Sequence, residues 1–213
     1  MGRIEIGLWH LEVRGKKCVE ALRRNGFDAE FFPTQELLRK RVLKECETAH
    51  SIGFGGSFSI SEMGIYESLE GKGKLLLDHG RVPAEKKAET RIAQQACDLF
   101  LTGTNAVTLT GVLVNLDGNG NRTNAMTFGP KRAIVVAGGN KIVSDVPDGI
   151  RRIKTVAAPR NAKRLGVATP CATTGICEEC SSPQRICRVY SIIERKPTNS
   201  AISVYVCGDP MGL

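Results

Sequence analysis

The sequence predicts an α/β protein in which a mostly parallel sheet is flanked by helices. Segments with helical periodicity alternate with short apolar runs along the chain, a pattern typical of parallel sheets covered on both sides. Three of the apolar runs lead directly into glycine-rich turns. The composition is that of an ordinary globular protein, with 41% hydrophobic and 24% charged residues. At 213 residues we expect a single domain over positions 1–213.

The N-terminal half supplies the first alternating elements. An amphipathic helix is expected from residue 4 to 25, and Gly26 is well placed to end it. Thr34 is a favourable N-cap for a second helix, and Pro83 fits the first turn of a third. The expected elements are helices at 4–25, from 34 and at 83–97, and strands at 28–32, from 51 and at 74–78, of which the last is expected to be buried.

The C-terminal half continues the same pattern. Residues 132–137, RAIVVA, form an apolar run that predicts a strand buried on both faces. Asp145 or Pro147 is expected to begin a helix. The expected elements are strands at 99–104, 112–116, 132–137, 189–194 and 202–207, one helix reaching about 157 and a short one ending near 165.

The most polar stretch covers residues 101–132 and is rich in Thr, Asn, Gly and Asp. Such residues fill a core poorly, but they turn a backbone and offer short hydrogen-bonding groups. One interpretation is a surface hairpin with Asp117-Gly118 as its turn. The other is the rim of a pocket that grips a small polar ligand with backbone and amide groups.

Three glycine turns, at residues 55–57, 103–105 and 138–141, each follow a predicted strand. Ligands of parallel sheets bind outside the carboxyl ends of the strands, where all three turns would meet. Backbone N–H groups at residues 55–57 would face an anion there. The candidate ligand-binding residues are Gly55, Gly56, Ser57, Thr102, Gly103, Thr104, Asn105, Asn115, Asp117, Gly120, Asn121, Arg122, Asn140 and Lys141.

The charge balance favours an anionic ligand. The formal net charge is +8, yet only 5% of residues are aromatic and no basic tail is present, so nucleic acid is not the expected partner. No apolar run approaches the ~20 residues of a membrane span. The N-terminus carries charges where a signal peptide needs an apolar core, so we expect a cytoplasmic protein without membrane association.

The eight cysteines divide into two groups. Four are scattered through predicted elements and are expected to be core residues: Cys18, Cys46, Cys97 and Cys207. The others crowd into a loop at 169–188 with the spacing C-x5-C-x2-C-x6-C, namely Cys171, Cys177, Cys180 and Cys187. This set predicts thiolate ligation of an iron–sulfur cluster. Structural zinc is the alternative, and redox-active thiols, a disulfide or no cofactor remain open.

The chain resembles the lactate-utilisation (LUD) domain proteins, including their LutC/YkgG-type subunits. The resemblance runs from about residue 16 to the end, on GFGGS (53–57), FLTGTN (100–105), GVLVN (111–115), GNR (120–122), FGP (128–130), NKIV (140–143), APRNA (158–162) and TPC (169–171). It implies a three-layer α/β fold similar to ribose-phosphate isomerases, glucosamine-phosphate deaminases and CoA transferases. It also implies a link to the oxidation of lactate to pyruvate, in which LutC-type subunits work together with iron–sulfur partner subunits. The resemblance does not identify any catalytic residue in this chain.

Two functional hypotheses follow. The first is a redox-linked accessory protein of lactate or hydroxy-acid utilisation that binds a small anionic organic acid at the glycine turns and an iron–sulfur cluster at the cysteine loop. The second is a binding or isomerase-like protein for a small phosphorylated metabolite, with a structural zinc or unmetallated cysteines. Residues 102–120 are similar to a stretch of methylthioribose-phosphate isomerases, but Thr104 or Asn105 occupies the place of the acid. A homo-oligomer is expected by analogy with the family.

Overall fold

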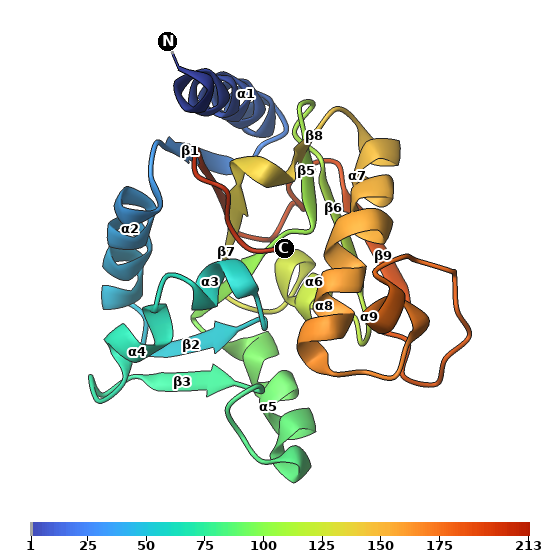
Figure 1. The fold of residues 1–213 in the computed structure, drawn as a ribbon. Coiled ribbons are helices and arrows are strands. Elements are labelled where there is room, and N and C mark those ends of the chain that lie inside the picture. Colours follow the sequence, from blue (N-terminus) through green and yellow to red (C-terminus); the bar gives the residue numbers. More distant parts are fainter. Residues whose placement is uncertain (1) are drawn as a thin grey trace.

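The central feature of the computed structural model, which describes residues 2–213, is a six-stranded sheet in which all neighbouring strands are parallel (Figure 1). In spatial order the strands are β1 (Asp28–Phe32), β10 (Ile202–Cys207), β7 (Arg132–Gly138), β4 (Leu99–Gly103), β2 (Ser51–Phe54) and β3 (Leu75–Asp78). The expected mostly parallel sheet flanked by helices is therefore confirmed.

Strand β7 explains why the sheet needs cover on both faces. Ile134 and Val136 belong to one buried cluster, and the alternating Val135 and Ala137 belong to another. The predicted doubly buried strand is thus confirmed. Strand β3 differs from its prediction as a buried strand. It is the edge strand, and Leu75 is 60% exposed.

Helices from the N-terminal half cover the two faces. Helix α1 (Arg3–Arg24) packs on β1 and β10 and contributes Cys18 and Leu22 to one cluster. Helix α2 (Gln35–Glu47) begins at the predicted cap, where Thr34 Oγ1 accepts a hydrogen bond from Leu37 N at 3.4 Å. The other helical elements before residue 142 are α3 (Phe58–Ser61), α4 (Ile65–Leu69), α5 (Lys87–Ala93) and α6 (Asn121–Thr127), with 3-10 turns η1 (Ala84–Lys86), η2 (Gln94–Ala96) and η3 (Gly139–Lys141).

A second, four-stranded sheet is a feature that the sequence did not predict. Its order is β8 (Ile142–Val143), β5 (Ala106–Thr108), β6 (Leu113–Asp117) and β9 (Val189–Ile193). Strands β5 and β6 form an antiparallel hairpin whose turn contains Gly111, not Asp117-Gly118. The proposed Asp117-Gly118 turn is therefore wrong. Gly111 has φ +80°, and a Cβ there would lie 2.6 Å from the Leu22 backbone nitrogen, so only glycine fits against α1.

One long helical segment covers the second sheet on the side of the large cavity described below. It consists of α7 (Val146–Arg152), a π-helical turn η4 (Ile153–Ala157) and α8 (Ala158–Leu165). Asp145 caps α7, as predicted, by accepting a hydrogen bond from Asp148 N at 2.8 Å. Pro159 lacks an N–H, and in a regular α-helix its ring would clash with the preceding turn. The wide π-helical turn η4 ends at Ala157, two residues before this proline. Helix α9 (Pro170–Thr174) then leads into the cysteine loop (Figure 1).

Candidate functional site

A large cavity of about 370 Å³ opens at the carboxyl ends of β2, β4 and β7. Residues from all three glycine turns line it, together with side chains from α5, α6, η4 and α8. Of the candidate ligand-binding residues, those that line the cavity are Gly55, Gly56, Ser57, Gly103, Thr104, Asn105, Asp117, Asn121, Arg122 and Lys141. The other four do not line it: Thr102, Asn115, Gly120 and Asn140. The structure therefore brings most of the predicted set together around one space.

Close backbone packing explains why two of the turn positions are glycine. A Cβ on Gly103 would lie 2.6 Å from Ser57 Oγ and 3.3 Å from the Val136 carbonyl oxygen. A Cβ on Gly55 would lie 2.8 Å from Thr102 Oγ1. The ends of β2 and β4 thus approach each other more closely than residues with side chains allow.

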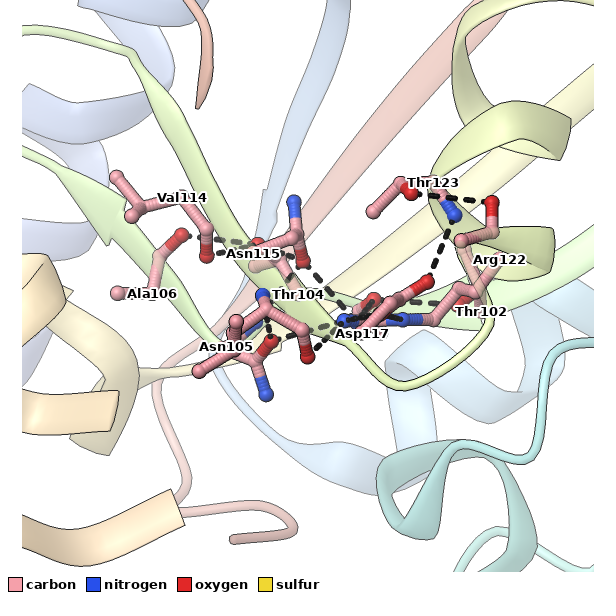
Figure 2. Close-up of polar contacts among 12 residues, drawn as sticks. Thr102, Thr104, Asn105, Ala106, Val114, Asn115, Asp117, Arg122 and Thr123 are labelled. Carbon is pink, nitrogen blue, oxygen red and sulfur yellow. Dashed lines mark hydrogen bonds and ion pairs between the residues drawn. The ribbon is translucent and has the colours of Figure 1, made fainter. Parts of the chain in front are cut away.

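Arg122, at the start of α6, joins the loops around the cavity (Figure 2). One of its terminal nitrogens donates to the Gly103 carbonyl at 2.9 Å and to Asn115 Oδ1 at 3.0 Å. The other donates to Asn105 Oδ1 at 2.8 Å, and Nε donates to Asp117 Oδ1 at 2.9 Å. Because its nitrogens are engaged by protein oxygens, Arg122 is a clamp that shapes the cavity, and Asp117 balances its charge.

The same network fixes the orientation of Asn105 (Figure 2). Its Oδ1 accepts hydrogen bonds from Leu116 N at 2.9 Å and from Arg122 at 2.8 Å. The amide oxygen is therefore turned into the network, and Nδ2 remains as a donor on a residue that lines the cavity. Behind it, Asn115 Oδ1 accepts from Thr104 Oγ1 at 3.1 Å and from Asn105 N at 3.2 Å. Asn115 thus supports the cavity wall from behind.

Lys141 is the most unusual cation of the site. It is 4% exposed, and its Nζ donates to Ser59 Oγ at 2.8 Å. Burial, together with the charges of Arg152 and Arg122, lowers its pKa to about 7, against a smaller opposing effect of Glu62. An anion in the cavity would supply the opposite charge that this ammonium lacks. Asn140, also predicted, instead accepts a hydrogen bond at Oδ1 from Met211 N at 3.0 Å.

Further cations around the cavity were not among the predicted site residues. Lys87, Arg91 and Arg164 line it, whereas Asp117 is the one acidic side chain among the described lining residues. Arg152 lies behind the wall and donates to the Asn105 carbonyl at 2.7 Å. Residues 151–164 form a basic run, most of which faces solvent, and two of its arginines also contribute to this site: Arg152 through that hydrogen bond, and the exposed Arg164 as a lining residue.

The cysteine loop borders a second, small cavity of about 20 Å³. All four loop cysteines line this cavity, which we call the cysteine cavity: Cys171, Cys177, Cys180 and Cys187. Arg185 holds the loop together by donating to the Cys180 carbonyl at 2.6 Å and to the Cys187 carbonyl at 2.7 Å. Glu179 adopts φ +50°, a left-handed conformation rare outside glycine, within the CxxC turn. Its carboxylate pairs with Lys154 of η4, which attaches the loop to the helical segment.

The two cavities share a wall. Ala158, Ile186 and Cys187 line both of them. Burial raises the pKa of Cys187 to about 11, and the neighbouring loop thiols add to that effect while Arg185 opposes it. As they stand, no three His, Cys, Asp or Glu side chains between residues 2 and 213 are grouped closely enough to hold a metal ion. The other four cysteines are buried in the core, as predicted, at positions 18, 46, 97 and 207.

A parallel sheet with glycine turns and a cation-lined cavity at its carboxyl edge defines the class of this chain: an α/β protein with a pocket at the strand ends. The chain belongs to the LUD domain family, whose model matches residues 15–206. The expected family is thereby confirmed. No helix in the described part of the chain has both the length and the apolar character to cross a membrane.

One solved structure is similar to the chain over nearly its whole length. The chain is similar to a DUF162 family protein from Deinococcus radiodurans, with 14% identity and a TM-score of 0.50 over 97% of this chain and 99% of that one. Ribose 5-phosphate isomerase from Plasmodium falciparum matches with 17% identity and a TM-score of 0.33 over 52% of each chain. Ribose 5-phosphate isomerase A from Neisseria gonorrhoeae matches with 17% identity and a TM-score of 0.31 over 53% and 56%. No curated protein matches the sequence.

Proposed function

We propose that this chain is a redox-linked accessory protein of lactate or related hydroxy-acid utilisation. In this proposal a small organic anion binds in the large cavity and an iron–sulfur cluster binds at the cysteine loop. Membership of the LUD domain family suggests the metabolic setting. The observation that carries the proposal is the shared wall, because Cys187 lines both the cation-rich cavity and the cysteine cavity.

The lining of the large cavity supports an anionic ligand. Lys141 is buried with a hydroxyl as its hydrogen-bond partner, so a carboxylate would restore the charge balance that burial has disturbed. Asn105 lines the cavity with its Nδ2 left as a donor, and Gly56 and Ser57 line it as well, whereas the Gly55 N–H donates to the Leu101 carbonyl at 2.9 Å. A volume of about 370 Å³ lies at the lower end of the range for small-molecule sites. This combination suits a small carboxylic acid.

The cysteine loop supports a thiolate-bound cofactor. Four sulfur donors around one cavity match the donor set of an iron–sulfur cluster, which joins the thiolates through several iron atoms and does not need them to meet at one ion. When bound, such a cluster accepts and donates single electrons. Arg185 holds two of the cysteine-bearing backbones, and its charge offsets that of the thiolates. An iron–sulfur partner subunit would then exchange electrons with the chain.

The cofactor is tested by purifying the chain without oxygen and measuring its visible absorption, iron, sulfide and zinc. We expect a broad band at the blue end of the visible range with matching iron and sulfide, and we expect Cys180→Ser to lose most of it. Cys18→Ala, at a buried cysteine on α1, is the matched control and should keep it. A colourless protein with one zinc would make the loop structural, and a metal-free protein would contradict the cofactor proposal.

The anion is tested by thermal shift with lactate, pyruvate and inorganic phosphate. We expect stabilisation by the organic acids and its loss in Lys141→Met. Lys163→Met, at an exposed lysine of α8, is the matched control and should respond like the wild type. Equal ligand responses in the two variants would contradict the role of the cavity. Size-exclusion chromatography with light scattering tests the expected homo-oligomer independently.

A further inference from the structure

The inference starts from Gln94, a fully buried glutamine in η2. Its Nε2 donates to the Phe54 carbonyl at 2.8 Å and to the Leu77 carbonyl at 2.8 Å. Both partners are backbone acceptors, so the NH₂ group must face them and both of its hydrogens are used. The amide orientation is therefore fixed by β2 and β3, and Oε1 is left as an acceptor.

This orientation determines the tautomer of His79. Its Nδ1 lies 3.3 Å from Gln94 Oε1, an atom that only accepts hydrogen bonds. Gln94 Nε2 also lies 3.3 Å from the same ring nitrogen, but it has no hydrogen left to donate there. Nδ1 must therefore carry the proton. In a neutral imidazole the other nitrogen, Nε2, then bears a lone pair and acts as an acceptor.

The acceptor nitrogen belongs to the large cavity. His79 lines that cavity, and its Nε2 lies 3.5 Å from the position that a Cβ on Gly56 would occupy. Gly56 has φ +69°, so the turn brings bare backbone, without a side chain, beside the imidazole. Among residues 2–213 no hydrogen-bond donor engages His79 Nε2. His79 Nε2 is therefore a hydrogen-bond acceptor of the cavity that no group between residues 2 and 213 uses.

The charges around His79 keep the imidazole neutral near pH 7. Burial lowers its pKa, and the charges of Arg91 and Lys87 on α5 act in the same direction. The Gln94 hydrogen bond and Asp78 of β3 oppose that shift without reversing it. The neutral imidazole can therefore accept a hydrogen bond at Nε2, whereas the neighbouring Lys and Arg side chains can only donate.

We propose that His79 recognises a hydroxyl group of the ligand, by accepting its hydrogen bond at Nε2, and that Gln94 is the positioning residue that fixes this role. The inference rests on the proposed function and specifies its ligand class: a hydroxy acid is favoured over the corresponding oxo acid. A hydroxyl donates to Nε2, whereas a keto oxygen has no hydrogen to donate and would face the lone pair. Sites that hydrogen-bond a hydroxyl discriminate strongly against ligands that lack it.

The tautomer is tested directly, without any ligand, by long-range ¹H–¹⁵N NMR of the histidine rings at pH 7. The three histidines are assigned with single substitutions, including His79→Phe and His50→Phe. We expect His79 to carry its proton on Nδ1, and we expect Gln94→Met to give a mixture of tautomers. A proton on Nε2 in the wild type would overturn the proposal. A merely structural Gln94 would leave the tautomer unchanged in the variant, which would overturn its positioning role.

The specificity is tested by calorimetric titration with lactate and pyruvate. His79→Phe should weaken lactate binding by about tenfold, the typical loss for one hydrogen bond, and pyruvate binding far less. His50→Phe, at an exposed histidine, should change neither. An equal loss for both acids would overturn the hydroxyl role. If the wild type binds neither acid, the proposed function and the hydroxyl role of His79 both fail, whereas an equal loss for both acids leaves the proposed function standing and overturns the His79 role alone.

Discussion

The large cavity and the cysteine loop share a wall, yet they are held in place in different ways. The cavity is built from strand ends of the parallel sheet, and Arg122 links its loops through buried hydrogen bonds. The loop has exposed residues such as Ile176, at 68% exposure, and is held by Arg185, by a surface ion pair and by hydrogen bonds of Ser182, Gln184 and Arg188 that lie near the surface. The fold itself therefore preorganises the cavity, whereas the loop rests on surface contacts and is suited to being completed by a bound cofactor.

The largest loss of stability is expected when the cavity loses Arg122. Arg122→Ala would leave Asp117, whose side chain is 7% exposed, without its partner. Breaking a buried ion pair costs about 3–5 kcal/mol of the free energy of unfolding. Urea unfolding monitored by circular dichroism measures this loss. A change below about 1 kcal/mol, typical of an exposed pair, would contradict the clamp.

Close packing gives the next effect. Gly103→Ala places a Cβ 2.6 Å from Ser57 Oγ, so neighbouring atoms must shift. Overpacking of this kind typically costs about 1–3 kcal/mol. Gly175→Ala in the cysteine loop is the matched control, since no atom lies within 4 Å of its Cβ and only its φ of +75° opposes the change. Comparing the two unfolding midpoints tests the contrast, and a larger loss for Gly175→Ala would reverse it.

Lys141 adds a pH dependence that only the cavity should have. Its pKa falls from 10.5 when unfolded to about 7 when folded, so between these values the unfolded chain binds one more proton. The contribution of Lys141 to stability therefore rises with pH across this window, by about 1.4 kcal/mol per unit at most. Lys141→Met should remove this slope from the free energy of unfolding. Parallel curves for wild type and variant would show that the lysine is not desolvated.

The same titration should govern the ligand. With a pKa of about 7, Lys141 is mostly charged at pH 6 and mostly neutral at pH 8.5, so stabilisation by an organic anion should be larger at the lower pH. Thermal shifts at the two pH values measure this, with Lys163→Met as the control that keeps the dependence. An anion effect that is independent of pH in the wild type would place the ligand away from Lys141.

The smallest effect on stability is expected in the cysteine loop. Arg185→Ala removes hydrogen bonds to two partly exposed loop carbonyls, so the metal-free chain should lose about 1 kcal/mol or less. Its iron content after anaerobic purification should fall much more clearly, because the cysteine-bearing backbones are no longer held together. A variant that retains full iron would show that the cofactor does not depend on this arginine.

The sequence predicted those parts of the molecule that depend on local patterns. The alternation of elements, the cap at Thr34 and the convergence of the three glycine turns at one edge follow from periodicity and from the geometry of parallel sheets. Helix α6 has no such signal, because NRTNAMT is a poor helix former that starts after a glycine. It is supported by tertiary contacts instead, such as the hydrogen bond from Thr123 N to Asp117 Oδ2 at 3.1 Å.

Other site features depend on residues far apart in the sequence. The tautomer of His79 follows from a glutamine fifteen positions later and from carbonyls of two different strands. His79 directly follows Asp78, the last residue of β3, and gave no sequence signal of a role. Strand β5 has only three residues, too short for a period to appear. Arg122 was predicted as a ligand-binding residue, and it lines the cavity, but its hydrogen bonds add a role that the sequence did not show, that of a clamp between the surrounding loops.

The wide turn η4 also sets which side chains of α8 reach the large cavity. An α-helix advances by about 100° per residue, so adding or removing one residue rotates everything beyond it by that angle. Asn161 and Arg164 line the cavity in the present phase of α8. Deleting one residue from the wide turn would direct them elsewhere and bring other side chains of α8 to the wall. A change of one residue in length, with no substitution, would thus give the cavity a different chemical lining while leaving the sheet intact.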